Sequence, residues 1–561
     1  MDAIPTRAAY LSEPAYRTPL ERTLRMLLLC VVVAITFFAN NRLIAPDIME
    51  SRNLITAREM VEKGNYLIPT MNDKLRLEKP PLPTWVAASI ESVSPGDVAL
   101  QRAAAGLMGV LLVVFFYLFA LKVMRIDPLL PTLILCTCYN FVLMGRTASW
   151  DIYCHAFMTG SIYFSARALT ERGHKLWTFF WAGLLMGLSI LSKGPVSLFA
   201  LYLPFILAML LCVPMTMRGK WPGLSLMIVM AVGVSCWWYL YIHAVRGDEL
   251  AAMAAQETGS WMGRNVRPWW YYWSFFLETG IWAVMLITSI IMIGFHYRPW
   301  RRREYLVPLV WMLAALVLLS CMPEKKTRYL LPVIIPASML MGQLVQEWRS
   351  AFSKKYVPMV EKVSFRLNCW LLALAVAALP VAGWIFLSSR GLMPVWQLVL
   401  FGIFFLLVAV GLGISAVRLR PGNMVWLVAI LFCVAEIFAL PKVMPLINNP
   451  EMKSISATAT MPELKGLPFY APDDEELRIE MVYAARRSIH QIDLSDTASL
   501  RRRLPAVVLT HGGTAEKVPA AFLQTVDTVH IGTYDDNRRP KGTRRYSPRF
   551  IYNVTVLREK Q

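Results

Sequence analysis

Long apolar runs alternate with short polar or proline-rich breaks over most of this 561-residue chain. Runs close to the ~20 residues that an α-helix needs to cross a bilayer recur from residue 24 to about residue 440. The pattern predicts an all-α polytopic membrane protein with about thirteen spanning helices. The predicted spans are 24–40, 99–121, 128–144, 152–170, 177–192, 196–213, 222–243, 271–295, 305–322, 329–346, 367–388, 394–416 and 423–440.

The connector between the first two predicted spans, residues 41–98, is long, and long loops in compact proteins are often functional. Apolar and charged residues take opposite faces of Ser51–Lys63, which predicts an amphipathic helix lying at the membrane interface. Gly64 is expected to end that helix. A second short helix is predicted after Pro80 and Pro81, running through 85–88.

Beyond about residue 446 the spanning runs stop and polar residues dominate. Strand-like and helix-like stretches alternate there, which predicts a small α/β domain. The predicted strands are 466–470, 481–484, 506–509, 528–531 and 550–556, and the predicted helices are 473–478 and 514–523. We therefore expect two domains: a membrane domain over 1–445 that includes the loop 41–98, and a soluble domain over 446–561.

The composition agrees with a membrane protein, because 56% of the residues are hydrophobic and only 17% are charged. The net charge of +20 would fit a nucleic-acid partner, but lysine and arginine lie at predicted helix ends rather than in one basic domain, which argues against one. Cations accumulate in every second connector, as in cytoplasmic loops. We therefore place the N-terminus in the cytoplasm and, with an odd number of spans, residues after about 441 outside. The supporting cations are Arg7, Arg17, Arg22, Arg25, Lys122, Arg125, Arg172, Lys175, Arg218, Lys220, Arg298, Arg301, Arg302, Arg303, Arg349, Lys354, Lys355, Lys362, Arg366, Arg418 and Arg420.

The other connectors carry charges of both signs beside prolines and aromatic residues. Charges that serve only topology need not alternate in sign, so the mixture favours a polar site at the outer surface, where a lipid headgroup binds. The alternative is a set of scattered, solvated loop charges. The residues concerned are Asp47, Glu50, Arg52, Glu78, Lys79, Asp151, Lys193, Arg264, Arg267, Glu324, Lys325, Lys326 and Arg328.

Several of these residues have a simpler interpretation beside the functional one. Asp151 follows Trp150 at a predicted helix start, where a carboxylate also serves as a cap or favours the helix dipole. Lys193, before Gly194 and Pro195, is also explained as a helix end. Arg267 is also explained as an interface anchor, and the cations at 325–328 as ordinary loop charge.

Five stretches follow one another in a specific order along the membrane part. They are PDIMESRNLITAREMVEKGNYLIPT over 46–70, LEKPPLPTW over 77–85, SWD over 149–151, LSKGP over 191–195 and KKTRYLLP over 325–332. With these matches the loop 41–98 resembles the first periplasmic loop of the aminoarabinose transferase and protein O-mannosyltransferase group, which are GT-C fold glycosyltransferases. The resemblance covers most of the membrane part.

This resemblance implies transfer of a sugar from a polyprenyl-phosphate carrier to an acceptor, with inversion, at the outer face of the inner membrane. It needs cations at the leaving phosphate and a carboxylate that receives the acceptor proton. Prolines hold Glu78 and Lys79 on a stiff turn. The phosphate-binding candidates are Lys79, Arg264, Arg328, Tyr329, Glu78 and Lys193, and the catalytic candidates are Glu50, Asp47 and Asp151.

One departure leaves the base open. The group usually has adjacent Asp and Glu before this arginine, whereas Met49 stands at the aspartate position here and Asp47 lies two residues earlier. The acceptor (a lipid A-type lipid, a protein or a surface glycan), the sugar and the use of a divalent metal also stay open. The soluble domain is expected to cover the active face or guide the acceptor. A lipid-linked sugar transporter is the alternative, but it would favour midplane charges and internal repeats.

Overall fold

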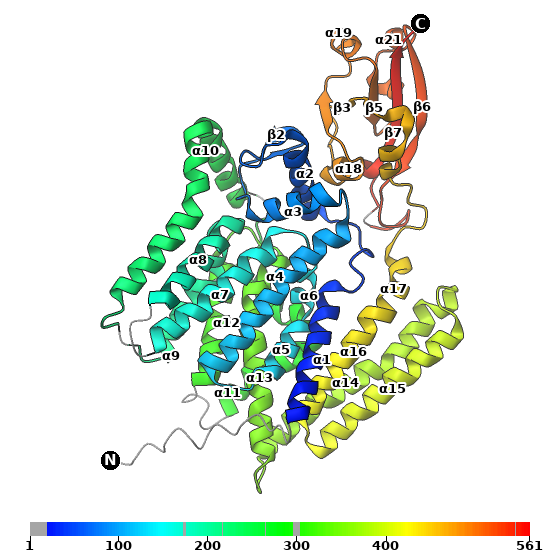
Figure 1. Cartoon of the computed structure of the whole chain (residues 1–561). Helices are drawn as coiled ribbons and strands as arrows, with labels where there is room; N and C mark the ends of the chain where they lie inside the picture. Colours follow the sequence, from blue (N-terminus) through cyan, green and yellow to red (C-terminus); the bar gives the residue numbers. More distant parts are fainter. Residues whose placement is uncertain are drawn as a thin grey trace. The chain divides into compact units, whose positions relative to one another are not determined.

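The computed structural model describes residues 19–171, 176–215, 217–263, 265–295, 303–544 and 546–560. The chain forms two compact units (Figure 1). The helical unit contains the residues up to Asn41, Glu78–Pro80 and Arg102–Ala439. The sheet unit contains Arg42–Leu77, Pro81–Gln101 and Leu440–Gln561.

The helical unit is a bundle of apolar helices. In the part of the chain that the structure describes, eight helices are long and apolar enough to cross a membrane, and two shorter apolar helices accompany them. The all-α membrane part is thus confirmed, while the number thirteen stays a prediction. The helices are α1 (Pro19–Phe38), α4 (Val98–Leu118), α5 (Leu129–Cys136), α6 (Tyr139–Gly145), α7 (Trp150–Thr170), α8 (Leu176–Lys193), α9 (Leu203–Cys212), α10 (Trp221–Gly263), α11 (Ala283–Phe295), α12 (Arg303–Cys321), α13 (Leu331–Phe352), α14 (Met359–Phe386), α15 (Val395–Arg418) and α16 (Pro421–Val434). Short 3₁₀ or π segments join some of them: η2 (Phe119–Met124), η3 (Leu198–Tyr202), η4 (Trp269–Trp282), η6 (Thr327–Leu330), η7 (Ser388–Arg390) and η8 (Ala435–Ala439).

The predicted span 128–144 is two helices, α5 and α6, with a break at Thr137 and Cys138. The Thr137 hydroxyl donates to the Leu133 carbonyl at 2.8 Å and accepts the Trp282 indole N–H at 2.8 Å. A threonine that bonds back to the preceding turn offers the backbone an alternative to helix. No proline or charge marks this break, so the apolar run did not reveal it.

The predicted span 222–243 belongs to a longer helix, α10, which continues past a kink at Arg246 (φ −143°, ψ 50°) to Gly263. Alanine, the strongest helix former, occupies 251, 252, 254 and 255 beyond the kink. The predicted span 271–295 likewise differs, because η4 leads into α11 through Gly280 at φ +65°. Only glycine adopts that backbone routinely.

The sheet unit is built on a five-stranded mixed sheet with strand order β4-β3-β5-β7-β6 (Figure 1). β3 pairs in parallel with β4 and β5, and β7 pairs antiparallel with β5 and β6. The predicted small C-terminal α/β domain is thus confirmed. The elements are α17 (Leu440–Ile447), η9 (Ile455–Thr460), η10 (Pro462–Leu464), β3 (Phe469–Pro472), α18 (Ile479–Ala484), β4 (Ile489–Ile492), α19 (Thr497–Arg501), β5 (Ala506–Thr510), α20 (Thr514–Lys517), α21 (Ala520–Leu523), β6 (Val526–Asp535), η11 (Pro548–Phe550) and β7 (Ile551–Glu559).

Two local predictions in this unit were wrong. Residues 481–484 form part of helix α18 rather than a strand, because Met481, Val482 and Ala485 are buried together at helical spacing. Residues 473–478 form a turn and extended chain rather than a helix. Strand β4 was not predicted, since His490 and Gln491 interrupt its apolar ends.

The loop 42–101 packs largely with the C-terminal segment. Its helices α2 (Ile48–Lys63) and α3 (Leu82–Val93) follow the predicted ones, and Gly64 ends α2 at φ +64° as expected. Ile55 of α2 is fully buried in the same hydrophobic core as strands β3, β5 and β7. α2 is therefore covered by protein, not laid in the lipid interface, and the unit boundary falls differently from the predicted 445/446.

Polar contacts hold the same loop in place. The Asn72 side chain donates to the Ile489 carbonyl and accepts the Ile489 N–H, both at 2.7 Å, as a neighbouring strand would. The strands β1 (Thr70–Met71) and β2 (Lys74–Leu75) form a hairpin around it. The buried Glu59 carboxylate accepts the Lys63 ammonium at 3.1 Å and the Thr70 hydroxyl at 2.5 Å.

Candidate active site

Three charged side chains meet in the helical unit, and we call Asp151, Lys193 and Arg328 the ion triad. Asp151 stands in the first turn of α7, Lys193 is the last residue of α8, and Arg328 lies in η6 before α13. One Asp151 oxygen accepts a hydrogen bond from the Lys193 ammonium, and the other pairs with the Arg328 guanidinium at 3.1 Å. The Asp151 side chain is 1% exposed, so this carboxylate is removed from solvent.

Further polar groups line the same place. The Lys193 and Lys326 ammonium groups lie 5.2 and 5.6 Å from the centre of the Tyr329 ring. Lys326 pairs with Glu324 at 2.6 Å. Three cations of this cluster, Lys193, Lys326 and Arg328, pair with two carboxylates, Asp151 and Glu324. Partly desolvated cations held in this way favour an anionic ligand.

Tyr272 holds the connector that carries Arg328 in place. The Tyr272 hydroxyl accepts the Lys326 N–H at 3.0 Å and donates to the Lys326 carbonyl at 3.1 Å. Lys325, predicted as part of a functional trio, is buried, and its ammonium donates to the carbonyls of Met322 and Arg267. Burial lowers the pKa of Lys325. Its role in the structure is therefore to hold two segments together.

Those two segments are the ones that carry the predicted arginines. Val266 and Glu324 form an antiparallel bridge, and the Lys325 N–H donates to the Asn265 carbonyl at 3.2 Å. Arg264 itself lies outside the described residues. Arg267 contributes its backbone, because its N–H donates to the Pro323 carbonyl at 3.3 Å.

Lys79 belongs to the helical unit, and its ammonium pairs with Glu257 of α10 at 2.9 Å. Both side chains are half-buried, as is Glu78 next to Lys79. Glu257 was not singled out from the sequence, although it begins the stretch ETGSWMGR that carries Arg264. The structure thus brings Asp151, Lys193, Arg328 and Tyr329 together and gives Lys79 a separate partner.

Asp47 and Glu50 belong to the sheet unit and form a capping box at the start of α2. One Asp47 oxygen accepts the N–H groups of Met49 and Glu50, both at 2.8 Å. A Glu50 oxygen accepts the Asp47 N–H at 3.2 Å, and the Glu50 residue is only 3% exposed. Both carboxylates therefore have a structural task whatever their chemistry.

Sequence reasoning missed the polar groups that surround the ion triad. His155, one turn after Asp151, is buried, and its Nδ1 atom has no hydrogen-bond partner among the described residues. The Asn140 amide donates to Glu278 at 3.0 Å and to the Thr327 carbonyl at 3.2 Å, next to Arg328. The only signal was that polar side chains recur inside apolar helices, where each usually has a function. No group of three or more His, Cys, Asp or Glu side chains in the described ranges is arranged as a metal site.

Known proteins are similar to this chain in sequence and in structure. The profile of the dolichyl-phosphate-mannose-protein mannosyltransferase family matches residues 78–239. An uncharacterized protein of Aquifex aeolicus is 26% identical over 338 residues, which span 58% of this chain and 65% of that protein. The undecaprenyl phosphate-alpha-4-amino-4-deoxy-L-arabinose arabinosyl transferase of Pseudomonas aeruginosa LESB58 is 25% identical over 486 residues, 82% of each chain.

The crystal structure of ArnT from Cupriavidus metallidurans bound to undecaprenyl phosphate superimposes with a TM-score of 0.67 at 16% identity, covering 96% of this chain and 99% of that one. The apo structure of the same protein gives 0.61. The fold is therefore the GT-C fold of membrane glycosyltransferases.

Together the matches support a GT-C fold glycosyltransferase that is similar to the aminoarabinose transferase and protein mannosyltransferase group. The chain is a multi-pass inner-membrane protein. The predicted resemblance and the predicted enzyme class are confirmed.

Proposed function

We propose that this protein transfers a sugar from a polyprenyl-phosphate carrier to an acceptor at the outer face of the inner membrane, with inversion at the anomeric carbon. The observation that carries the proposal is the ion triad, in which two cations share one buried carboxylate beside Lys326 and Tyr329. Such a site binds an anion at little reorganisation cost, because the charges are already held in place.

The main requirement of the reaction at this site is stabilisation of the leaving phosphate. The lipid phosphate leaves with its bonding electrons as the acceptor oxygen attacks, and cations stabilise the negative charge that develops on it. Arg328 offers a planar fork of donors that suits phosphate. Asp151 holds Arg328 and Lys193 in position, so we assign it a positioning role here rather than that of a base.

The acceptor must lose a proton as its oxygen attacks, and a carboxylate is the group suited to receive it. Glu50 and Asp47 stay our candidates, as the family resemblance implies. Lys79 stays a candidate for the carrier phosphate, with Glu257 as its resting partner. A reaction at the outer face requires the predicted orientation, with the N-terminus in the cytoplasm. The arabinosyl transferase relatives are named for their lipid-linked donor, whereas the matching family is named for a protein acceptor. A lipid A-type lipid, a protein and a surface glycan each present a hydroxyl, so all three stay candidate acceptors.

The test uses the purified protein reconstituted with an undecaprenyl-phosphate-linked aminoarabinose or hexose. Sugar transfer to lipid A, to protein and to glycan acceptors is measured. Wild type should transfer the sugar to one of these acceptors. Arg328→Gln should lower kcat/KM by about 100-fold or more, the loss seen when a transition-state donor is removed.

A matched control exists at the far end of α13, the helix that follows Arg328. Arg349 in the last turn of α13 pairs with Asp127 at 3.1 Å, the same separation as between Arg328 and Asp151. Arg349→Gln should keep activity near that of wild type. Equal losses in both variants would mean that the effect is structural. Donor movement across the membrane without transfer would favour the transporter.

A further inference from the structure

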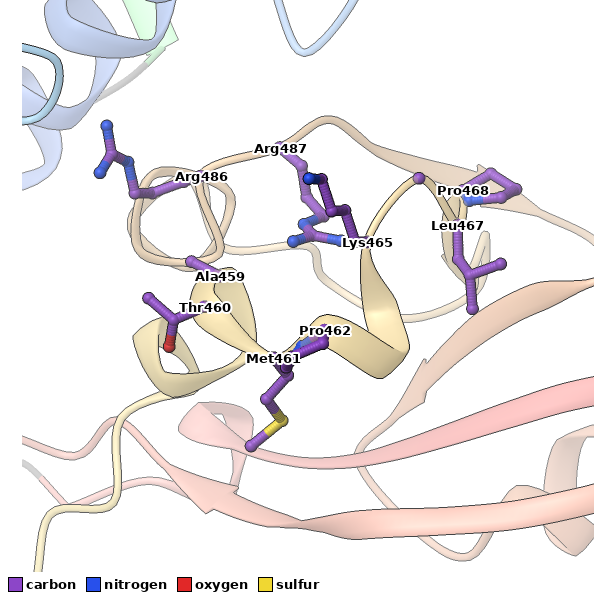
Figure 2. A pocket seen from close by; sticks show the side chains of 10 residues that line it. Ala459, Thr460, Met461, Pro462, Lys465, Leu467, Pro468, Arg486 and Arg487 are labelled. Atoms are coloured by element: carbon purple, nitrogen blue, oxygen red, sulfur yellow. The ribbon is translucent and has the colours of Figure 1, made fainter.

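A pocket in the sheet unit lies between the turn after η10 and the turn after α18 (Figure 2). Its volume is about 670 Å³, within the roughly 300–1,000 Å³ of small-molecule sites. Three lining residues are cationic, Lys465, Arg486 and Arg487, and none is acidic. We infer that this pocket binds a phosphate-bearing group, a function that does not depend on the transferase reaction.

Arg487 is fixed in place before any ligand arrives. Its guanidinium donates to the Leu464 carbonyl at 2.8 Å, the Ala485 carbonyl at 3.3 Å and the Thr458 carbonyl at 3.4 Å. It also lies 4.4 Å from the centre of the Phe469 ring. These partners are neutral, so they orient the guanidinium without cancelling its charge. A held cation loses little side-chain entropy when an anion binds.

The Arg486 guanidinium points away from the other labelled side chains of the pocket (Figure 2) and lies beside Gly96 and Glu91. The Arg486 backbone adopts φ +54°, a left-handed conformation that residues other than glycine rarely hold. Its guanidinium lies 3.8 Å from a Glu91 oxygen, while the other Glu91 oxygen accepts the Gly96 N–H at 2.9 Å. The Arg486 side chain stays 47% exposed.

A further arginine adds positive charge nearby. Arg58 of α2 is 7% exposed, and its Nε and Nη2 atoms have no hydrogen-bond partner in the described part of the chain. Its ion pair with Glu62 is long, at 3.6 Å. Burial and, after it, the charge of Arg58 lower the pKa of Arg487. Burial also lowers the pKa of Arg58, against the opposing charges of Glu62, Glu59 and Glu91, and Arg486 makes the smallest contribution. Arg58 therefore adds positive charge near Arg487 that neighbouring carboxylates partly offset.

The rest of the lining fits the organic body of such a ligand. Pro462, Leu467 and Pro468 give the pocket apolar walls, and Lys465 adds an exposed ammonium for which the described ranges contain no ion pair. Guanidinium groups match phosphate oxygens in pairs, whereas a carboxylate offers fewer acceptors. The same chemistry is offered by the headgroup of a phosphate-monoester lipid and by free phosphate.

Hydrogen exchange of the full-length protein in detergent tests this inference locally. Peptides covering 458–470 and 484–489 should gain protection on titration with inorganic phosphate or with dihexanoyl phosphatidic acid. Protection by the lipid alone would identify a headgroup site, and protection by both would identify a general phosphate site. If neither ligand protects these peptides, the inference is wrong.

Variants separate this pocket from the ion triad. Lys465→Glu together with Arg486→Asn should raise the half-saturating concentration about 10-fold or more, and asparagine tolerates the left-handed backbone of position 486. Arg502→Glu, an exposed cation outside the pocket, should leave it unchanged. Arg487 is left intact because it supports three carbonyls.

Arg328→Gln should also leave the protection unchanged. Loss of protection in that variant would assign the phosphate to the ion triad instead and overturn the inference. Unchanged protection in the Lys465→Glu/Arg486→Asn variant would overturn it as well. Failure of sugar transfer in wild type would refute the proposed function while leaving the pocket standing, so the two failures are distinguishable.

Discussion

Replacing Asp151 by asparagine removes the charge that Lys193 and Arg328 share while keeping the shape of the side chain. Asp151 is 1% exposed, so no water replaces the lost charge. Two cations are then left in a buried site without their common carboxylate. We expect a large loss of stability and a loss of donor binding, because both cations move away from each other.

The magnitude follows from the geometry. At 3.1 Å, a single pair of charges attracts by about 5 kcal/mol at an effective dielectric constant of about 20. Measured losses on removing one partner of a buried pair are about 3–5 kcal/mol. We therefore expect the Asp151→Asn variant to lose about 3–5 kcal/mol of unfolding free energy. Asp127→Asn weakens the pair with Arg349, whose side chain is 31% exposed against 16% for Arg328; this more accessible pair should lose about 1 kcal/mol or less.

The assay is equilibrium unfolding of the purified proteins in mixed micelles, followed by tryptophan fluorescence. A double variant, Asp151→Asn with Lys193→Met, removes one of the stranded cations and should recover part of the loss. The two substitutions should therefore be non-additive. An unfolding free energy for Asp151→Asn within about 0.5 kcal/mol of wild type, or strictly additive losses, would refute the reasoning.

Of three further predictions, two concern candidate site residues and one concerns an ion pair of the sheet unit. Asp47→Asn and Glu50→Gln preserve the capping box, since asparagine is as good an N-cap as aspartate and glutamine serves at N3. The variant that loses kcat at unchanged thermal stability identifies the base. Unchanged kcat in both variants would exclude both residues. Lys79→Ala should raise KM for the lipid-linked donor more than Glu257→Gln does in steady-state kinetics, because Lys79 is the candidate phosphate ligand and Glu257 is its partner in the resting structure. Equal effects would make the pair structural. Burial alone would raise the pKa of Asp73, but hydrogen bonds from Lys63 and Ser488 bring it below its usual value. The ionised Asp73 carboxylate therefore stabilises the sheet unit above about pH 4, and this stabilisation is lost as the pH falls further, through the lowered pKa. Asp73→Asn should flatten the acid side of the curve of thermal stability against pH. An unchanged acid side would contradict the assignment.

Hydropathy alone predicted most of the helices, because an apolar run of spanning length has few other structures open to it. It failed where a break left no mark in the apolar pattern. Thr137 ends α5 through a hydroxyl hydrogen bond, and Gly280 turns the chain within η4, shortly before α11 begins. It also stopped α10 too early, because the polar, alanine-rich part of that helix lies past the apolar run.

The candidate site was predictable as a set of residues but not as an arrangement. The resemblance supplied Asp151, Lys193, Arg328 and Tyr329 separately, at distances of 42 and 177 positions along the chain for the two ion pairs. Pairing at such separations depends on tertiary packing, so the sequence could not say that Asp151 binds both cations. It likewise could not distinguish a base from a cap at Asp47.

The central claim is that the ion triad holds the phosphate of a polyprenyl carrier. Native mass spectrometry of undecaprenyl phosphate binding, compared among wild type, Arg328→Gln and Arg349→Gln, tests it most directly. We predict that wild type and Arg349→Gln bind the lipid equally well and that the affinity of Arg328→Gln is lower by about 10-fold or more. This is the loss expected for a charged hydrogen bond. Equal retention in all three proteins would contradict the claim.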